Sequence, residues 1–322
     1  MTQVFTLEHI RMVLAKLDLA PAIEQGFIAF SRGQVVVPPV GELIFSDPPG
    51  ETHIKYGYIK NSPHYVVKIA AGFYQNPELG LSSSSGVMLV FSSQTGRLET
   101  VLLDDGWLTE VRTALAGQIA AKYLAPANVR KIAVLGTGLQ AQLQVEYLKP
   151  VTSCTHIHVW GRSIAHQQRY KEQLEAKGYR VMLAVTPAEA VRAAQIIITA
   201  TPSHIPLLQA ADISPGTHIT AMGSDTEGKQ ELAADILQMA DLVVADSLAQ
   251  CRQRGEIATA LAEKKIGAGD IVELGRVIDL SHPGRTGVKQ VTVADLTGVA
   301  VQDIKIATAV CQAWVLEQAV DM

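Results

Sequence analysis

The sequence predicts an α/β protein of two domains, a Rossmann dinucleotide-binding domain and a discontinuous mixed-sheet α+β domain. Residues 33–103 carry short Val-, Ile- and Tyr-rich runs divided by Pro, Gly and Ser, which is typical of a sheet with tight turns. After Pro126, apolar strands alternate with helical segments, and a glycine-rich turn follows the first of these strands. We expect residues 1–125 with 295–322 to form the mixed-sheet domain and residues 126–294 to form the Rossmann domain.

The bulk composition excludes several classes of protein. The 322 residues are 48% hydrophobic, enough for two cores, and the net charge of -4 with scattered Lys and Arg argues against a nucleic-acid partner. The three cysteines form no CxxC pair and the histidines show no metal-ligand spacing, so no metal site is expected. The N-terminus is amphipathic, and no apolar run approaches the roughly 20 residues that span a bilayer. We therefore expect a cytoplasmic protein without membrane contact.

The first domain should begin with two helices and continue as a sheet. Thr6 can cap the first helix, and a second helix covers about residues 21–31. The runs QVVVPPV, THIKYGYI, YVVKIAAGF and GVMLVFS predict strands of a mostly antiparallel or mixed sheet, with a hairpin turn at residues 93–97 and a flexible serine-rich loop at residues 82–86. Residues 108–124 are Ala-rich and predict a helix with Thr109 as its N-cap.

The second domain should hold a parallel sheet. KIAVLG, HIHVWG, AQIIITAT, THITAMG and DLVVADS predict buried strands, and the segments after the first two predict helices. The C-terminal stretch, residues 293–319, predicts one helix that packs back on the first domain. That return would make the first domain discontinuous.

The segment KIAVLGTGLQAQ predicts a dinucleotide site. Gly136 permits a tight turn after the strand, Gly138 lets a pyrophosphate approach backbone N–H groups, and the small Ala141 allows close packing of helix on strand. The alternative is a glycine-rich turn that binds no ligand. The next strand ends in HVWGRS without the acid that usually binds the ribose of NAD, which favours NADPH with Arg162 on its 2′-phosphate. Arg162 could instead stack on adenine or face solvent.

Nearly the whole chain resembles the ornithine cyclodeaminase/mu-crystallin family. The matching segments are LTEVRTALAGQIAAKYLA, GTGLQAQ, GSDTEGKQEL, DSLAQCRQRGEI and DLTGVAVQD, in that order. The resemblance implies a Rossmann domain joined to a substrate-binding and dimerisation domain, a homodimer, and chemistry on amino acids through imines. It also implies that Thr113 and Gln140 approach the cofactor phosphates and that Thr297 and Gly298 approach the nicotinamide. Thr201 and Ser224 are predicted to contact the cofactor as well.

The resemblance assigns catalytic and substrate-binding residues. Lys68 matches an active-site lysine that holds a carboxylate or donates a proton, Arg112 matches an arginine that grips the α-carboxylate, and Asp225 matches an acid that faces the reacting nitrogen. Each has a structural alternative: a lysine at a strand end, a charge on a helix face, and an N-cap for a helix beginning near Lys229.

One position departs from the family pattern. Val40 stands where typical members have an arginine, which puts strict cyclodeaminase activity in doubt. Nearby, His53, Lys55 and Lys60 offer positive charge for a second acidic group of the substrate. The stretch resembles family members that reduce iminosuccinate, a substrate with two carboxylates.

Three functions follow from these observations. The first is an NADH- or NADPH-dependent reductase that converts a small imino acid, such as iminosuccinate or another ketimine, to the L-amino acid. The second is an ornithine cyclodeaminase that recycles NAD. The third is a crystallin-like binding protein without turnover, against which the joint presence of Lys68, Arg112 and Asp225 argues.

Overall fold

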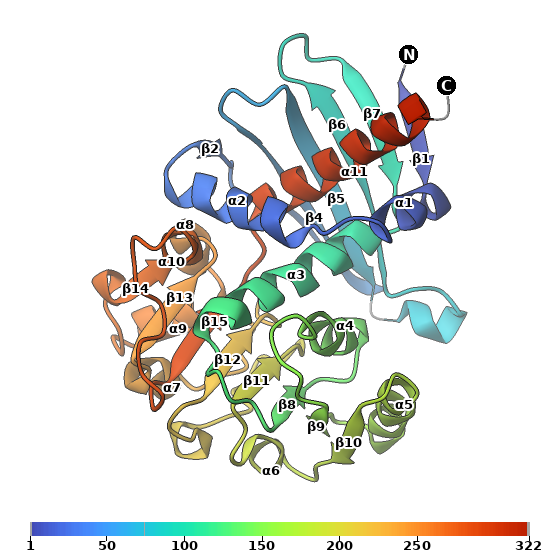
Figure 1. The fold of residues 1–322 in the computed structure, drawn as a ribbon. Helices are drawn as coiled ribbons and strands as arrows, with labels where there is room; N and C mark the ends of the chain where they lie inside the picture. The colour runs from blue at the N-terminus through green and yellow to red at the C-terminus, as the bar shows by residue number, and fades with distance from the viewer. Residues whose placement is uncertain (1, 74, 321–322) are drawn as a thin grey trace. The chain divides into compact units, whose positions relative to one another are not determined.

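The chain forms two compact units (Figure 1). The computed structural model describes residues 2–73 and 75–320, so Met1, Tyr74, Asp321 and Met322 of the predicted domains lie outside the described residues. Unit 1 comprises residues 1–112 with 299–322, and unit 2 comprises residues 113–298. The first boundary thus falls inside one continuous helix, α3 (Trp107–Leu124), rather than at the predicted residue 125.

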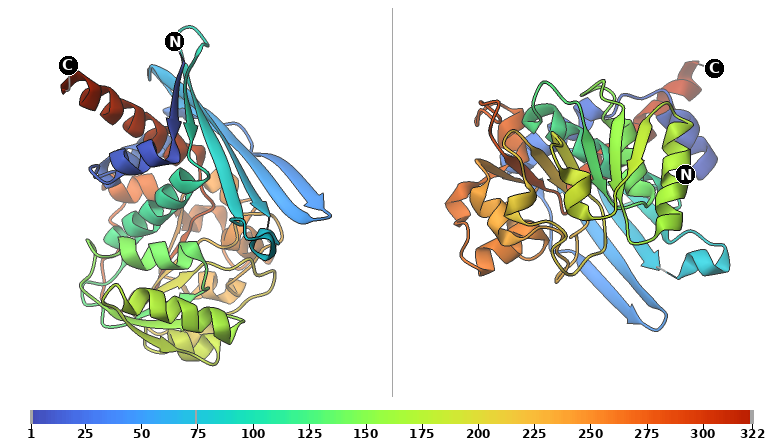
Figure 2. Two further views of the ribbon diagram at one scale, coloured as in Figure 1. Left: turned by 90° about the vertical axis from the view of Figure 1, so that its right-hand side faces the viewer. Right: turned by 90° about the horizontal axis from the view of Figure 1, so that it is seen from below.

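Unit 1 is built on a mixed sheet in the order β1-β7-β6-β5-β4-β2, with β3 paired to β4. Its strands are β1 (Gln3–Thr6), β2 (Val35–Val36), β3 (Gly41–Ser46), β4 (Pro49–Ile59), β5 (His64–Phe73), β6 (Ser84–Ser92) and β7 (Leu98–Leu103). The β1–β7 pair is parallel and the other pairs are antiparallel. The mixed sheet and the hairpin at residues 93–97 are therefore confirmed. Figure 2 shows the β3–β4 hairpin, in light blue, extending from this sheet.

The helices of unit 1 include α1 (Leu7–Leu14), α2 (Ala20–Ser31), the 3₁₀ helix η1 (Asn76–Leu79) and α11 (Ala300–Val320). The predicted cap of α1 is confirmed, because the Thr6 hydroxyl accepts a hydrogen bond from the His9 N–H at 3.4 Å. Helix α11 packs against α2, β4 and β5, as expected for a tail that returns to the first domain.

Two local predictions for unit 1 were wrong. Thr109 is not an N-cap, because α3 already begins at Trp107 and the Asp104 carboxylate accepts from the Leu108 N–H at 2.8 Å. Gly106, with φ of 80°, makes the preceding turn possible. The serine-rich run is not simply a loop: β6 begins at Ser84, where pairing with β5 satisfies its backbone groups.

Unit 2 holds a parallel sheet in the order β10-β9-β8-β11-β12-β15-β13-β14. Its strands are β8 (Ile132–Leu135), β9 (His156–Trp160), β10 (Arg180–Leu183), β11 (Ile196–Thr199), β12 (His218–Ala221), β13 (Leu242–Ala245), β14 (Ile271–Glu273) and β15 (Thr292–Asp295). Ile132 and Val134 of β8 belong to one core cluster and Ala133 and Leu135 to another, so both faces are covered. Strand order reverses between β8 and β11, which makes their carboxyl ends a topological switch point. The predicted Rossmann fold is confirmed.

Short helices connect these strands. They are α4 (Leu139–Tyr147), α5 (Ile164–Glu175), α6 (Pro187–Val191), α7 (Ala234–Met239), α8 (Leu248–Cys251), α9 (Gly255–Ala262), α10 (Leu274–Ile278), and the 3₁₀ helices η2 (Ala210–Asp212) and η3 (Ala268–Asp270). Within residues 2–73 and 75–320, no helix combines the length and apolar character needed to cross a membrane.

The C-terminal prediction needs one correction. Residues 293–319 do not form a single helix, because β15 occupies Thr292–Asp295 and α11 begins only at Ala300. Strand β15 lies between β12 and β13 and is buried along its whole length. A strand that is buried on both faces has no alternation of apolar and polar residues. Its short apolar run therefore cannot be distinguished by periodicity from the start of the helix that follows.

Arg285 ties the segment before β15 to the rest of unit 2. Its guanidinium donates to four backbone carbonyls, those of Leu124, Thr217, Gly287 and Gln290. It also donates to the side-chain hydroxyl of Thr292. These groups come from the end of α3, the start of β12, the start of β15 and the loop before β15. The planar five-donor fork of arginine suits such a divergent set of acceptors.

We expect Arg285→Lys to lower the free energy of unfolding by about 2–4 kcal/mol, because an ammonium cannot reach these acceptors together and leaves buried carbonyls unpaired. Urea unfolding followed by circular dichroism measures this change. The exposed Arg276 of α10 provides the matched control, and Arg276→Lys should have little effect. Equal stability of the two variants would contradict the assigned role.

Candidate functional site

Lys68 lies in the middle of the unit 1 sheet. It is opposite Lys55 of β4 on one side and Met88 of β6 on the other, in antiparallel register. Both lysines are buried, with Lys68 only 2% exposed. A buried ammonium is costly unless it is paired. The structure therefore brings two predicted site residues together and requires a counter-charge beside them.

That counter-charge is Asp303, in the first turn of α11. Its Oδ1 lies 3.2 Å from Lys68 Nζ and 3.0 Å from Arg112 Nε, and the side chain is 1% exposed. Arg112 Nη1 also donates to Gln302 Oε1 at 3.3 Å. Lys55, Lys68, Arg112, Gln302 and Asp303 form what we call the cation cluster. Sequence reasoning missed Asp303 and Gln302, although both stand in the quoted DLTGVAVQD segment.

The cation cluster shifts proton affinities. The pKa of Lys68 falls to about 7, first because of burial and then because of the Arg112 charge, whereas Asp303 acts in the opposite direction. Burial raises the pKa of Asp104, which the charge of Lys68 partly opposes. An amine with a pKa near 7 can both hold and release a proton under neutral conditions. The surface-lysine alternative for Lys68 is excluded by its burial.

The other two basic residues predicted near the substrate, His53 and Lys60, contact different groups of unit 1. His53 lies between two glutamates, with Nδ1 3.5 Å from Glu42 and Nε2 3.6 Å from Glu51. Lys60 is exposed and donates to the Gly33 carbonyl at 2.9 Å. Of the basic residues predicted near β4, Lys55 is the one that faces Lys68.

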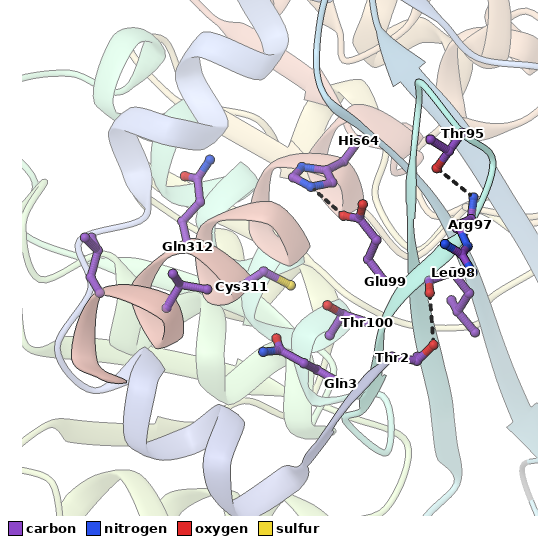
Figure 3. Close-up of a pocket in the computed structure, with 12 residues that line it drawn as sticks. Thr2, Gln3, His64, Thr95, Arg97, Leu98, Glu99, Thr100, Cys311 and Gln312 are labelled. Carbon is purple, nitrogen blue, oxygen red and sulfur yellow. Dashed lines mark hydrogen bonds and ion pairs between the residues drawn. The ribbon is translucent and has the colours of Figure 1, made fainter. Parts of the chain in front are cut away.

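A separate cavity of about 820 Å³ lies in unit 1 beside the second half of α11 (Figure 3). It contains an ion pair between His64 Nε2 and Glu99 Oε2 at 3.0 Å, and its wall includes Thr100 and Cys311. Its lining includes none of the predicted site residues. The size of a cavity therefore does not locate the predicted site residues in this unit.

The glycine-rich turn of unit 2 lies at the switch point after β8. Gly136 has φ of 124°, and a Cβ there would lie 2.5 Å from the Ala200 carbonyl oxygen after β11. Gly138 precedes α4 without a side-chain cap, and a Cβ there would meet nothing within 4 Å. Ala141 is fully buried. An uncapped helix N-terminus with open space over a glycine fits the phosphates of a dinucleotide.

Two buried carboxyl groups hold the loops after β11 and β12. Glu231 accepts from the backbone N–H and the hydroxyl of Thr201, both at 2.7 Å, and from the Gly223 N–H at 2.9 Å. Glu256 accepts from the Ser224 hydroxyl and from the Glu231 N–H. Burial and then the nearby Glu256 raise the pKa of Glu231 to about 8. Thr201 and Ser224 are predicted cofactor contacts, whereas the two acids that bind them were not predicted from the sequence.

Asp225 lies in the loop after β12, at the carboxyl edge of the parallel sheet. Its Oδ1 is 2.9 Å from the Nζ of the buried Lys229, and its side chain is 44% exposed. The expected helix near Lys229 does not exist, since α7 begins at Ala234. Asp225 is therefore not an N-cap.

The remaining predicted cofactor residues also lie in unit 2. The Asp246 carboxylate accepts from the Thr297 hydroxyl at 3.1 Å and from the Gly298 N–H at 2.6 Å, which fixes the turn after β15. Gln144 Nε2 donates to the Thr113 carbonyl at 3.0 Å and lies 3.4 Å from Gln140 Oε1.

Arg162 is exposed directly after β9, where no acid stands. The neighbouring Ser163 is used as the N-cap of α5 and accepts from the His166 N–H at 3.3 Å. Arg162 is thus the charged side chain at the end of this strand.

Sequence and structure comparisons both find proteins named as dehydrogenases or reductases. A protein of Rhizobium meliloti (strain 1021), named only provisionally as a dehydrogenase, is 40% identical over 293 residues, which cover 90% of this chain and 89% of that protein. The iminosuccinate reductase of Paracoccus denitrificans (strain Pd 1222) is 31% identical over 302 residues and 90% of each chain. A solved archaeal alanine dehydrogenase dimer with bound NAD is 30% identical with a TM-score of 0.89, covering 98% of this chain and 97% of that one.

A family model also matches residues 1–318. The resemblance predicted from the motifs is confirmed along nearly the whole chain. This protein is an oxidoreductase and belongs to the ornithine cyclodeaminase/mu-crystallin family.

Proposed function

We propose that this protein is an NADH- or NADPH-dependent reductase that converts a small imino acid to the L-amino acid. The observation that carries the proposal is the cation cluster, in which a lysine with a pKa near 7 and a guanidinium share one buried carboxylate. Such a cluster can bind a carboxylate and exchange a proton. The named activities of the relatives, on iminosuccinate and alanine, agree with this chemistry.

In this proposal each residue has a stated task. Arg112 binds the α-carboxylate and Lys68 holds it or supplies a proton to the developing amine, with Asp225 as a further proton carrier on the loop after β12. A bound, reduced nicotinamide supplies the hydride. Orientation of the substrate by the chain's own residues then accounts for much of the rate.

The proposed cofactor residues belong to unit 2, most of them in the loops at the carboxyl edge of its parallel sheet, with Thr113 on α3 and Gln140 and Ala141 on α4. We assign the phosphates to Gly138, Gln140 and Thr113, with Gly136 allowing the tight turn and the buried Ala141 allowing close helix packing, and the 2′ side of the ribose to Arg162, which favours NADPH. The remaining cofactor contacts are assigned to Thr201, Ser224, Thr297 and Gly298. A homodimer in the cytoplasm is proposed with them; the alanine dehydrogenase of similar fold is a dimer with NAD bound.

Iminosuccinate is the favoured substrate because Lys55 adds a second buried cation beside Lys68. A substrate with two carboxylates can use both. His53 is a weaker candidate than expected, because Glu42 and Glu51 surround it with negative charge. The relative from Paracoccus denitrificans is named for this substrate.

The proposal predicts rapid oxidation of NADH or NADPH when the protein is mixed with ammonia and oxaloacetate, and slower oxidation with pyruvate, glyoxylate or pyrroline-2-carboxylate. Loss of coenzyme absorbance measures each rate, and the same assay compares the two coenzymes. Ammonia release from ornithine with catalytic NAD, without net coenzyme oxidation, would assign the cyclodeaminase instead. Binding without any turnover would assign the crystallin-like alternative.

A second prediction concerns pH. If protonated Lys68 is the active form, kcat/KM for imine reduction should be constant below its pKa of about 7 and fall about tenfold per pH unit above it. Lys68→Arg should lower the rate about 10²-fold or more but remove this alkaline decline, because a guanidinium stays protonated. The same decline in Lys68→Arg would assign it to the substrate or to another residue.

A third prediction tests the dinucleotide site with three glycines. Gly138→Ala should leave stability unchanged and weaken coenzyme binding about tenfold, or about 1.4 kcal/mol, because the added methyl group enters open space meant for a phosphate. Gly269→Ala, at an equally open glycine in η3, is the matched control and should change neither property. Gly136→Ala should lower the melting temperature, since its φ and the Ala200 carbonyl exclude a Cβ. Calorimetric titration measures binding, and unchanged affinity in Gly138→Ala would refute the placement.

A further inference from the structure

Asp303 makes an unusual use of its carboxylate. One oxygen, Oδ1, serves both Lys68 and Arg112, while Oδ2 is buried and has no hydrogen-bond partner among the described residues. Arginine and carboxylate usually pair through two parallel hydrogen bonds. Here the guanidinium donates to Asp303 through Nε and to Gln302 through Nη1, so two different acceptors fix its orientation.

The place of Asp303 in α11 offers a simpler explanation, which the contacts do not support. Acids in the first turn of a helix commonly stabilise its N-terminus. The Asp303 carboxylate, however, points to cations from β5 and α3 and is 1% exposed. These two cations lie on other elements of unit 1, so the position of Asp303 reflects the cation cluster rather than its own helix.

Four charged groups face Lys68 from the elements packed around it. Lys55 lies on β4, Arg112 on α3, Asp104 in the loop after β7, and Asp303 on α11. Asp104 uses Oδ2 to accept from the Leu108 N–H at the start of α3. Asp303 is the carboxylate in direct contact with the ammonium. Without the charge of Asp303, Lys68 would keep two cations beside it and no carboxylate in direct contact, which would favour the neutral amine.

We propose that Asp303 is a positioning residue that keeps Lys68 protonated and holds Arg112 in one orientation. The catalytic meaning of this role rests on the proposed function, but the role itself concerns only the charges of unit 1. A substitution at Asp303 can remove its effect on the protonation of Lys68 while it keeps an acceptor for Arg112. An asparagine keeps an oxygen that can accept from Arg112 Nε but removes the negative charge that favours the ammonium.

The experiment follows the Nζ resonance of Lys68 by NMR in protein labelled with ¹⁵N-lysine, assigned by its loss in Lys68→Arg. In Asp303→Asn the titration midpoint of Lys68 should move downward by about one to three pH units. Asp303→Glu should return it towards the wild-type value. Asp235→Asn, which removes the acid from the exposed Lys265–Asp235 pair, is the matched control and should leave Lys68 unchanged.

Kinetic measurements distinguish the effect of the Asp303 charge on Lys68 from the effect of Asp303 on the orientation of Arg112. Asp303→Asn should shift the alkaline decline of kcat/KM to lower pH with a small change in KM, whereas Asp303→Ala should also raise KM because Arg112 loses its acceptor. If Asp303→Asn fails to fold, the same contact can be tested in the wild-type protein. The carboxyl ¹³C chemical shift of Asp303 should change at the pH where Lys68 titrates.

The NMR titration needs no substrate, so its result is independent of the proposed function. If the protein reduces no imine, the proposed function is wrong. The role of Asp303 would still hold if the titration midpoint of Lys68 moves in Asp303→Asn. An unchanged Lys68 midpoint in folded Asp303→Asn, or a wild-type Asp303 carboxyl signal that ignores the Lys68 titration, would overturn the inference.

Discussion

A single buried carboxylate oxygen organises the charged centre of unit 1. Asp303 Oδ1 contacts residues that are 235 and 191 positions earlier in the chain, Lys68 and Arg112. Buried like charges repel strongly in a medium of low polarity, so two cations can share this space only around an anion. Helix α11 brings this anion to the sheet from a distant part of the chain. The discontinuous segment of this unit therefore contributes a buried counter-charge as well as apolar packing.

Unit 2 uses carboxyl groups differently, as acceptors for backbone N–H groups. Glu231, Glu256 and Asp246 each collect donors from loops at the carboxyl edge of the parallel sheet. Loops at such an edge have few partners of their own, and a fully used acceptor fixes several of them at once. The cofactor residues assigned there would be held in place before any ligand arrives, which lowers the entropic cost of binding.

Sequence reasoning succeeded where the signal is local. The glycine turn, the Thr6 cap and the hairpin at residues 93–97 depend on neighbours within a few positions. It failed where the structure or role of a segment depends on residues that are distant in the sequence. Asp104 starts α3 in place of Thr109, β15 is a strand only because β12 and β13 flank it, and Arg285 and Asp303 gain their roles from segments over 100 residues away. The family motifs located Lys68 and Arg112, but charge pairing in the folded chain was needed to find their carboxylate.

The position of β15 also governs how the protein can be made. During synthesis, β12 and β13 leave the ribosome well before the strand that joins them, so each has an unpaired edge until residues 292–295 follow. In unit 1, the part of the sheet that α11 covers likewise stays uncovered until the residues from Ala300 onward have been synthesised. Neither unit can finish folding on a nascent chain that lacks its last segment. The parallel sheet of unit 2 is therefore completed only after residues 292–295 are synthesised, and chains released before that point would carry exposed strand edges open to aggregation.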